Sequence, residues 1–346
     1  MKLQTGIIIL LCIILQTACD SDTEYFSIKN DDSITPVKIR GNTDSNVYIV
    51  YLTAPGGFEH NGQEGLLEEL ESQYGIVHYT FNRCENIGQN CSTSKFNYEQ
   101  LCSDLDLVLR VLFERYSNEK SIFLLGYGLG ANLILKYSDV GLYKERLNGI
   151  ILNGAAYNLR NTIKASKTKF AELMQTELTY GDYEGVESLL EKLNTVDINT
   201  ISPKDYYQLI DEQISDHIQD FSDGRIYYWR ELNFNCNYAY FLNTFSLRLL
   251  GDYDTDLTSH IKNISLPVNL LWLEDEFHIP LTIGKELYDL LETPDKELHI
   301  FDSICTLFDN SRTGLVRQSN TIRDFEDVAE ISAYSEKIID FVEKYK

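Results

Sequence analysis

Three glycines alternate with other residues at Gly126-Tyr127-Gly128-Leu129-Gly130, between a run that predicts a strand and a run that predicts a helix. A turn of this kind with serine in the middle exposes a nucleophilic hydroxyl at the end of a parallel sheet. Here the middle residue is Gly128, which has no side chain and cannot attack a carbonyl carbon. The segment therefore predicts the architecture of a nucleophile turn without its nucleophile.

Backbone N–H groups at two places could still bind a ligand. Pro55-Gly56-Gly57 follows a strongly apolar run, and adjacent glycines let N–H groups approach a carbonyl or carboxylate closely. Leu129 begins the predicted helix, whose N-terminus offers further donors and the positive end of the helix dipole. We predict that Gly56, Gly57 and Leu129 form an oxyanion-type binding set. The alternative, in which these glycines only make turns, fits the sequence equally well.

Strands and helices alternate along most of the chain. The predicted strands cover 25–29, 35–40, 47–53, 76–79, 121–125, 149–153, 268–273 and 297–301, and the first two form a hairpin. The predicted helices cover 64–74, 98–116, 129–137, 281–291 and 324–345. This alternation predicts an α/β fold with a mostly parallel sheet covered by helices on both faces.

The pattern changes between residues 159 and 262, where helical signals dominate and aromatic residues such as Tyr206 and Trp229 are frequent. Such a segment could form a lid whose aromatic rings contact sugars, peptides or aromatic ligands. The same rings would also serve simply to pack the lid on the rest of the protein. We therefore expect a core formed by 19–158 and 263–346 and a helical cap formed by 159–262.

The first 18 residues predict export. Lys2 precedes an apolar run at 7–15, which is too short for the roughly 20 residues that span a bilayer and fits a signal peptide. Cys19 follows the small residue Ala18, and this arrangement resembles a bacterial lipoprotein signal. The resemblance implies cleavage before Cys19, a lipid on that residue, and anchoring to a bacterial membrane or cell surface. Secretion as a soluble protein is the alternative.

Charge and cysteine spacing exclude several kinds of partner. The net charge of −23 and the pI of about 4.6 argue against nucleic acid binding and against membrane contact except through a lipid.

Cys84 and Cys91 flank a short loop and could form a disulfide. We expect no metal site, because the cysteines and histidines lack zinc-ligand spacing. We also expect no cofactor, because the glycine spacing is not that of a dinucleotide loop.

The order of elements resembles that of an α/β-hydrolase with a helical cap inserted after the sixth strand, and most closely that of the proline-iminopeptidase-like group. Pro55-Gly56-Gly57 stands where that group carries its glycine-rich loop, and 274–280 resembles its acid-bearing loop. The resemblance implies a triad of serine, acid and histidine in that chain order. These positions fall on Gly128, Glu276 and Thr306, and no histidine follows His299 in the chain.

Three functions follow from this pattern. The main prediction is a pseudoenzyme that binds a small molecule or peptide in its cleft, because the serine and histidine positions are both incompetent. The second is an active esterase or peptidase with a relocated nucleophile or base, such as Cys305 or Thr306 with His60 or His278. The third is a structural surface lipoprotein with a vestigial cleft. The sequence does not specify an oligomeric state.

Overall fold

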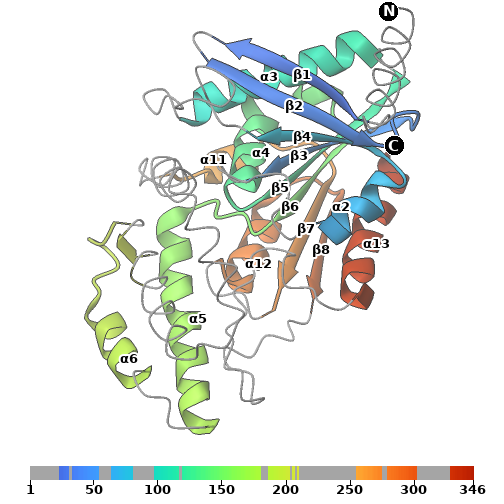
Figure 1. Ribbon diagram of the computed structural model, residues 1–346. Coiled ribbons are helices and arrows are strands. Elements are labelled where there is room, and N and C mark those ends of the chain that lie inside the picture. Colours follow the sequence, from blue (N-terminus) through green and yellow to red (C-terminus); the bar gives the residue numbers. More distant parts are fainter. Residues whose placement is uncertain are drawn as a thin grey trace, which may run out of the picture.

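A single eight-stranded sheet forms the centre of the protein (Figure 1). The computed structural model describes residues 23–30, 33–53, 64–80, 97–116, 119–180, 186–202, 205–206, 209, 255–274, 279–301 and 328–346. The strand order is β1-β2-β4-β3-β5-β6-β7-β8. The strands are β1 (Glu24–Asn30), β2 (Ser33–Gly41), β3 (Val47–Thr53), β4 (Gly75–Thr80), β5 (Ser121–Tyr127), β6 (Gly149–Asn153), β7 (Val268–Leu273) and β8 (Lys296–Phe301).

The pairing confirms the predicted mostly parallel sheet. Strands β3 to β8 are parallel to one another, whereas β2 runs antiparallel to both β1 and β4. The predicted hairpin is present, with Asn30 opposite Ser33. Long connections are needed between parallel strands, and the helices in the sequence supply them.

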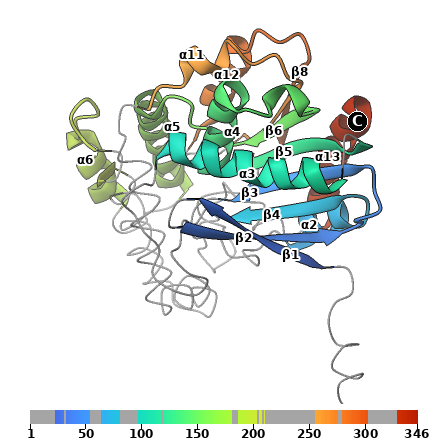
Figure 2. The ribbon, with the colours of Figure 1, turned by 90° about the horizontal axis from the view of Figure 1, so that it is seen from above.

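Helices cover both faces of the sheet, as predicted (Figures 1 and 2). They are α2 (Glu64–Glu71), α3 (Tyr98–Tyr116), α4 (Leu129–Val140), α5 (Leu159–Tyr180), α6 (Val186–Thr195), α11 (Thr258–Ile261), α12 (Leu281–Leu290) and α13 (Val328–Tyr345), with a 3₁₀ turn, η2, at Lys144–Arg146. Alternate residues of each strand face opposite layers, so Leu124 packs with the core under α3 and α4. Its neighbour Leu125 packs with the core under α2 and α13.

The segment predicted as a cap begins with two helices that pack on the main core. Helix α5 starts shortly after the carboxyl end of β6 and runs away from the sheet with α6 beside it (Figure 1). Ile163 and Phe170 of α5 and Leu193 of α6 are buried in the same core as α4. Most of 203–254, including Trp229, lies outside the described residues, so the boundaries of the cap remain a prediction.

No helix within the described ranges combines the length and the apolar character that crossing a membrane requires. The predicted signal peptide and Cys19 lie outside those ranges.

Candidate functional site

The chain turns from strand to helix at Gly128, as the sequence predicts. Gly128 has φ 49° and ψ −110°, a conformation that residues with side chains rarely adopt. Its N–H donates a hydrogen bond to the Asn153 carbonyl oxygen at 2.9 Å, and its own carbonyl accepts one from the Asn132 N–H at 3.0 Å. The turn is therefore held both by the end of β6 and by the first turn of α4.

The two flanking glycines are required by close packing. A Cβ on Gly130 would lie 2.3 Å from the Leu52 carbonyl oxygen of β3. A Cβ on Gly126 would lie 2.6 Å from Ile134 Cδ1 and 2.7 Å from the Ala131 nitrogen. Helix α4 can therefore lie against β3 and β5 only because neither residue has a side chain.

Gly128 differs from its two neighbours, because no heavy atom of the described residues lies within 4 Å of the position that its Cβ would occupy. Packing against the described residues therefore does not exclude a side chain at this position. The positive φ would impose a backbone strain of about 1–3 kcal/mol on any other residue. The turn at 126–130, called the elbow from here on, thus has the backbone of a nucleophile turn, and no described residue fills the space where the nucleophile would stand.

The start of α4 presents backbone donors beside this open space. Gly128 is the N-cap residue, and it has no side chain that could bond the free N–H groups of the first turn. Leu129 is half-buried at the first helical position. Gly56 and Gly57, the other members of the predicted binding set, lie outside the described residues.

A layer of buried aromatic and amide side chains lies beneath the elbow, on the side of α13. The Asn153 side-chain amide donates to the Tyr334 hydroxyl. The rings of Tyr127 and Tyr51 meet edge to face, with 5.8 Å between their centroids. Burial raises the pKa values of Tyr127 and Tyr334 well above the ordinary range, so both hydroxyls remain protonated. The Tyr334 hydroxyl can stabilise the turn through its bond with Asn153, and neither hydroxyl can act as a base at neutral pH.

The sequence alone does not predict this layer. The only available signal was the presence of polar or aromatic residues near the ends of three otherwise apolar strands, at Tyr51, Tyr127 and Asn153. Nothing in the sequence pairs Asn153 with Tyr334, which lies 181 positions away.

Each of the three described histidines contacts a carboxylate. His78 Nε2 lies 3.1 Å from Glu71 Oε1, and its side chain is only 8% exposed. His260 Nδ1 lies 2.7 Å from Asp139 Oδ2. His299 Nε2 lies 3.3 Å from Glu297 Oε2 within β8.

The described cysteine Cys102 is buried, and burial raises the pKa of its thiol to about 12. It therefore remains a thiol at neutral pH and is a poor nucleophile.

The remaining predicted site residues lie outside the described part of the chain. They are Glu276 and Thr306 of the degenerate triad, the alternative groups His60, His278 and Cys305, and the cysteines Cys19, Cys84 and Cys91. Their placement stays a prediction. The structure does describe both ends of the loop that carries Glu276, and the Trp272 Nε1–H donates to the Ile279 carbonyl oxygen across it at 2.7 Å.

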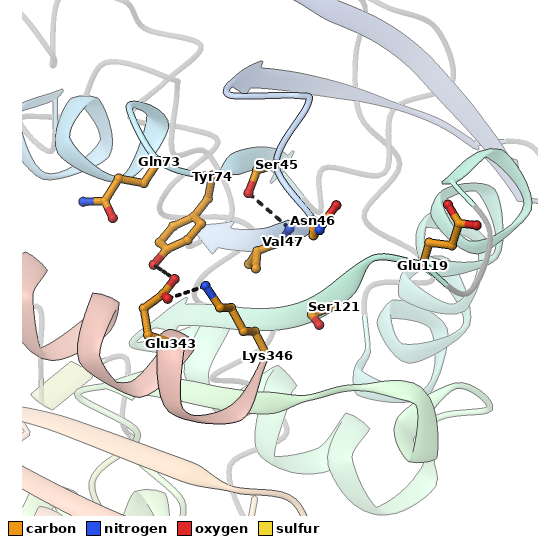
Figure 3. Close-up of a pocket in the computed structure, with 9 residues that line it drawn as sticks. All are labelled: Ser45, Asn46, Val47, Gln73, Tyr74, Glu119, Ser121, Glu343 and Lys346. Atoms are coloured by element: carbon orange, nitrogen blue, oxygen red, sulfur yellow. Dashed lines mark hydrogen bonds and ion pairs between the residues drawn. The ribbon is translucent and has the colours of Figure 1, made fainter.

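A pocket of about 450 Å³ lies at the other end of the sheet (Figure 3). It opens beside Val47 and Ser121, the first residues of β3 and β5, whereas Gly128 follows the last residue of β5. Tyr74 donates a hydrogen bond to Glu343, which also pairs with Lys346 (Figure 3). The ammonium of Lys346 holds the pKa of the Glu343 carboxyl below its usual value. Because three of its polar groups already bond one another and it lies at the opposite end of the strands from the elbow, we do not assign this pocket to the predicted cleft.

No family model matches the chain, and no curated protein matches it. Solved structures do resemble it. A membrane phospholipase A described as a bacterial virulence factor aligns with a TM-score of 0.54 and 12% identity over 98% of each chain. An esterase from Pyrococcus furiosus aligns with a TM-score of 0.53 and 12% identity, over 94% of this chain and 91% of the esterase. A putative lipase from Acinetobacter baumannii aligns with a TM-score of 0.52 and 14% identity, over 96% and 97%.

At these identities the likeness establishes the fold and not the activity. Together with the strand order and the turn at Gly128, it confirms that the chain has the α/β-hydrolase fold.

Proposed function

We propose that this α/β-hydrolase-fold protein is an exported, lipid-anchored binding protein that holds a small molecule or peptide at its elbow without hydrolysing it. The observation that carries the proposal is Gly128, which has the strained backbone of a nucleophile residue, while no described residue fills the space that a side chain there would occupy. The lipid anchor rests on Cys19 and the apolar run before it.

The chemistry left at the elbow is binding by backbone groups. Acyl transfer requires a nucleophile with a base beside it. Gly128 supplies no nucleophile, and the described histidines contact the carboxylates of Glu71, Asp139 and Glu297. The first turn of α4 still offers N–H donors and a positive dipole end, which favour a carboxylate or a polarised carbonyl. Ligands of this class therefore suit the site.

The purified mature protein is expected not to turn over arylesters or aminoacyl-arylamides. Aminoacyl-arylamides are included because the sequence resembles the proline-iminopeptidase-like group. Release of the chromogenic alcohol or amine measures turnover, and the variants Gly128→Ser and Gly128→Ser/Thr306→His are assayed beside the natural chain. Turnover by the natural protein that a thiol-blocking reagent abolishes would contradict the proposal and favour an active hydrolase that uses a cysteine such as Cys305.

Binding at the elbow is expected to be sensitive to a single methyl group. Gly128→Ala places that methyl in the open space and should weaken a ligand that lies against the turn by about tenfold, through lost contact or steric conflict. Isothermal titration with N-acyl amino acids and short peptides measures the affinity. Leu142→Ala, which truncates an exposed side chain elsewhere, is the control and should leave the affinity unchanged. Equal affinities for the Gly128→Ala and natural proteins would place the ligand away from the elbow.

A further inference from the structure

Strand β8 is the last strand of the sheet among the described residues (Figure 1). It pairs in parallel with β7, and among the described residues no strand pairs with its other edge. All six of its residues keep some exposure, and Ile300 is 44% exposed. The backbone groups of such an edge can form a ladder with another strand.

The ladder with β7 shows which residues face outward. The carbonyl oxygens of Asp295 and Phe301 accept hydrogen bonds from the Val268 and Glu274 N–H groups at 2.8 and 3.0 Å. Because successive residues of a strand direct their backbone groups to opposite sides, the odd-numbered residues face β7. The backbone groups of Lys296, Leu298 and Ile300 therefore face outward.

The ammonium of Lys296, the charge that could prevent pairing at this edge, is bonded elsewhere. Lysines on edge strands commonly prevent pairing with another chain. The Lys296 ammonium instead donates to the carbonyl oxygens of Tyr288 and Leu291, at 2.7 and 2.8 Å, at the end of α12. It also lies over the Tyr288 ring, 4.4 Å from its centroid. The outward backbone groups of β8 are thus not protected by this side chain.

We propose that β8 pairs antiparallel with β8 of a second copy of this chain, about a twofold axis through Leu298. Only outward-facing residues can exchange hydrogen bonds, and this register uses all three of them. It places Leu298 opposite itself and Lys296 opposite Ile300 of the second copy.

Hydrogen-bonding groups on the other face of β8 fit the same register. Glu297 and His299 share that face, where Glu297 contacts both His299 and Lys344 of its own chain. The twofold axis places Glu297 opposite His299 of the second copy, and the reverse, so that an acceptor faces an imidazole twice across the interface. Centring the axis on His299 instead would place two imidazoles opposite each other and would use only two outward-facing residues.

Sedimentation velocity of the mature chain over a range of concentrations tests the proposal, and a reversible dimer is expected. Ile300→Lys should raise its dissociation constant by about tenfold, because it places a lysine opposite Lys296 of the second copy at two symmetric positions. Ile300→Glu should retain the dimer, because it places a carboxylate there. Leu142→Lys, a change at a side chain that is 80% exposed, is the control and should leave the dimer unaffected. A chain that is monomeric at every concentration, or a dimer equally sensitive to Ile300→Lys and Ile300→Glu, would overturn the proposal.

Crosslinking tests the register directly. Leu298→Cys should give a disulfide-linked dimer under mild oxidation, because the two Cα atoms would lie within the range that a disulfide spans. His299→Cys should not, and the unsubstituted chain under the same oxidant corrects for the natural cysteines. Efficient crosslinking of His299→Cys with none of Leu298→Cys would overturn the pairing about Leu298.

Discussion

Gly130→Ala is expected to lower the free energy of unfolding by about 3 kcal/mol, whereas Gly128→Ala should lower it by only about 1 kcal/mol. The new methyl at 130 would meet the Leu52 carbonyl oxygen at 2.3 Å, and a backbone atom in the centre of the sheet cannot move aside alone. Helix α4 would have to shift away from β3 as a unit. At 128 the methyl would meet no atom of the described residues, and the expected cost is the strain of a positive φ.

Urea unfolding followed by far-UV circular dichroism measures both losses, and the two variants are matched because each adds one methyl group within the same turn. A larger loss for Gly128→Ala than for Gly130→Ala would mean that the turn requires glycine at its centre. The absence of a nucleophile would then have a structural cause. The expected order would instead mean that folding does not require glycine at 128. The absence of a nucleophilic side chain there would then have a functional and not a structural cause.

The order of strands and helices was predictable because apolar periodicity reports local structure directly. The runs at 47–53 and 149–153 lie in the middle of the sheet and are almost wholly apolar, as burial on both faces requires. The predicted helix over 64–74 ends earlier, at Glu71, because the chain must turn before β4 begins at Gly75.

The elbow was also predictable, because each of its glycines has a local steric consequence. Its supporting contacts were not. Asn153 of β6 bonds Tyr334 of α13, and His78 of β4 contacts Glu71 of α2. Such pairs depend on how elements pack, and no spacing in the sequence encodes them. The acid and histidine positions, Glu276 and Thr306, fall in loops whose residues follow no period, so their placement depends on the resemblance alone.

Trp272 is expected to control both stability and the loop that carries Glu276. Its side chain is 1% exposed in β7, and α12 lies so close that a Cβ on Gly284 would be 2.6 Å from Trp272 Cδ2. Its indole N–H bonds the Ile279 carbonyl oxygen and so joins the two ends of the loop. Trp272→Ala should lower the free energy of unfolding by about 3–5 kcal/mol, because it leaves a large cavity. Trp272→Phe should cost about 1–3 kcal/mol, because it keeps most of the ring but leaves the Ile279 carbonyl without its donor.

The loop effect can be separated from global destabilisation with Phe341→Leu, a change at a side chain fully buried on the other face of the sheet. Limited proteolysis, with cleavage sites mapped by mass spectrometry, measures opening at 274–280. Trp272→Phe should be cut there several-fold faster than Phe341→Leu under urea concentrations that give both variants the same global stability. That difference is expected because Trp272, unlike Phe341, bonds a residue of the loop. Equal cleavage of the two variants would show that Trp272 stabilises the core without fixing the loop. The conformation of the predicted acid loop would then be independent of the bond between β7 and Ile279.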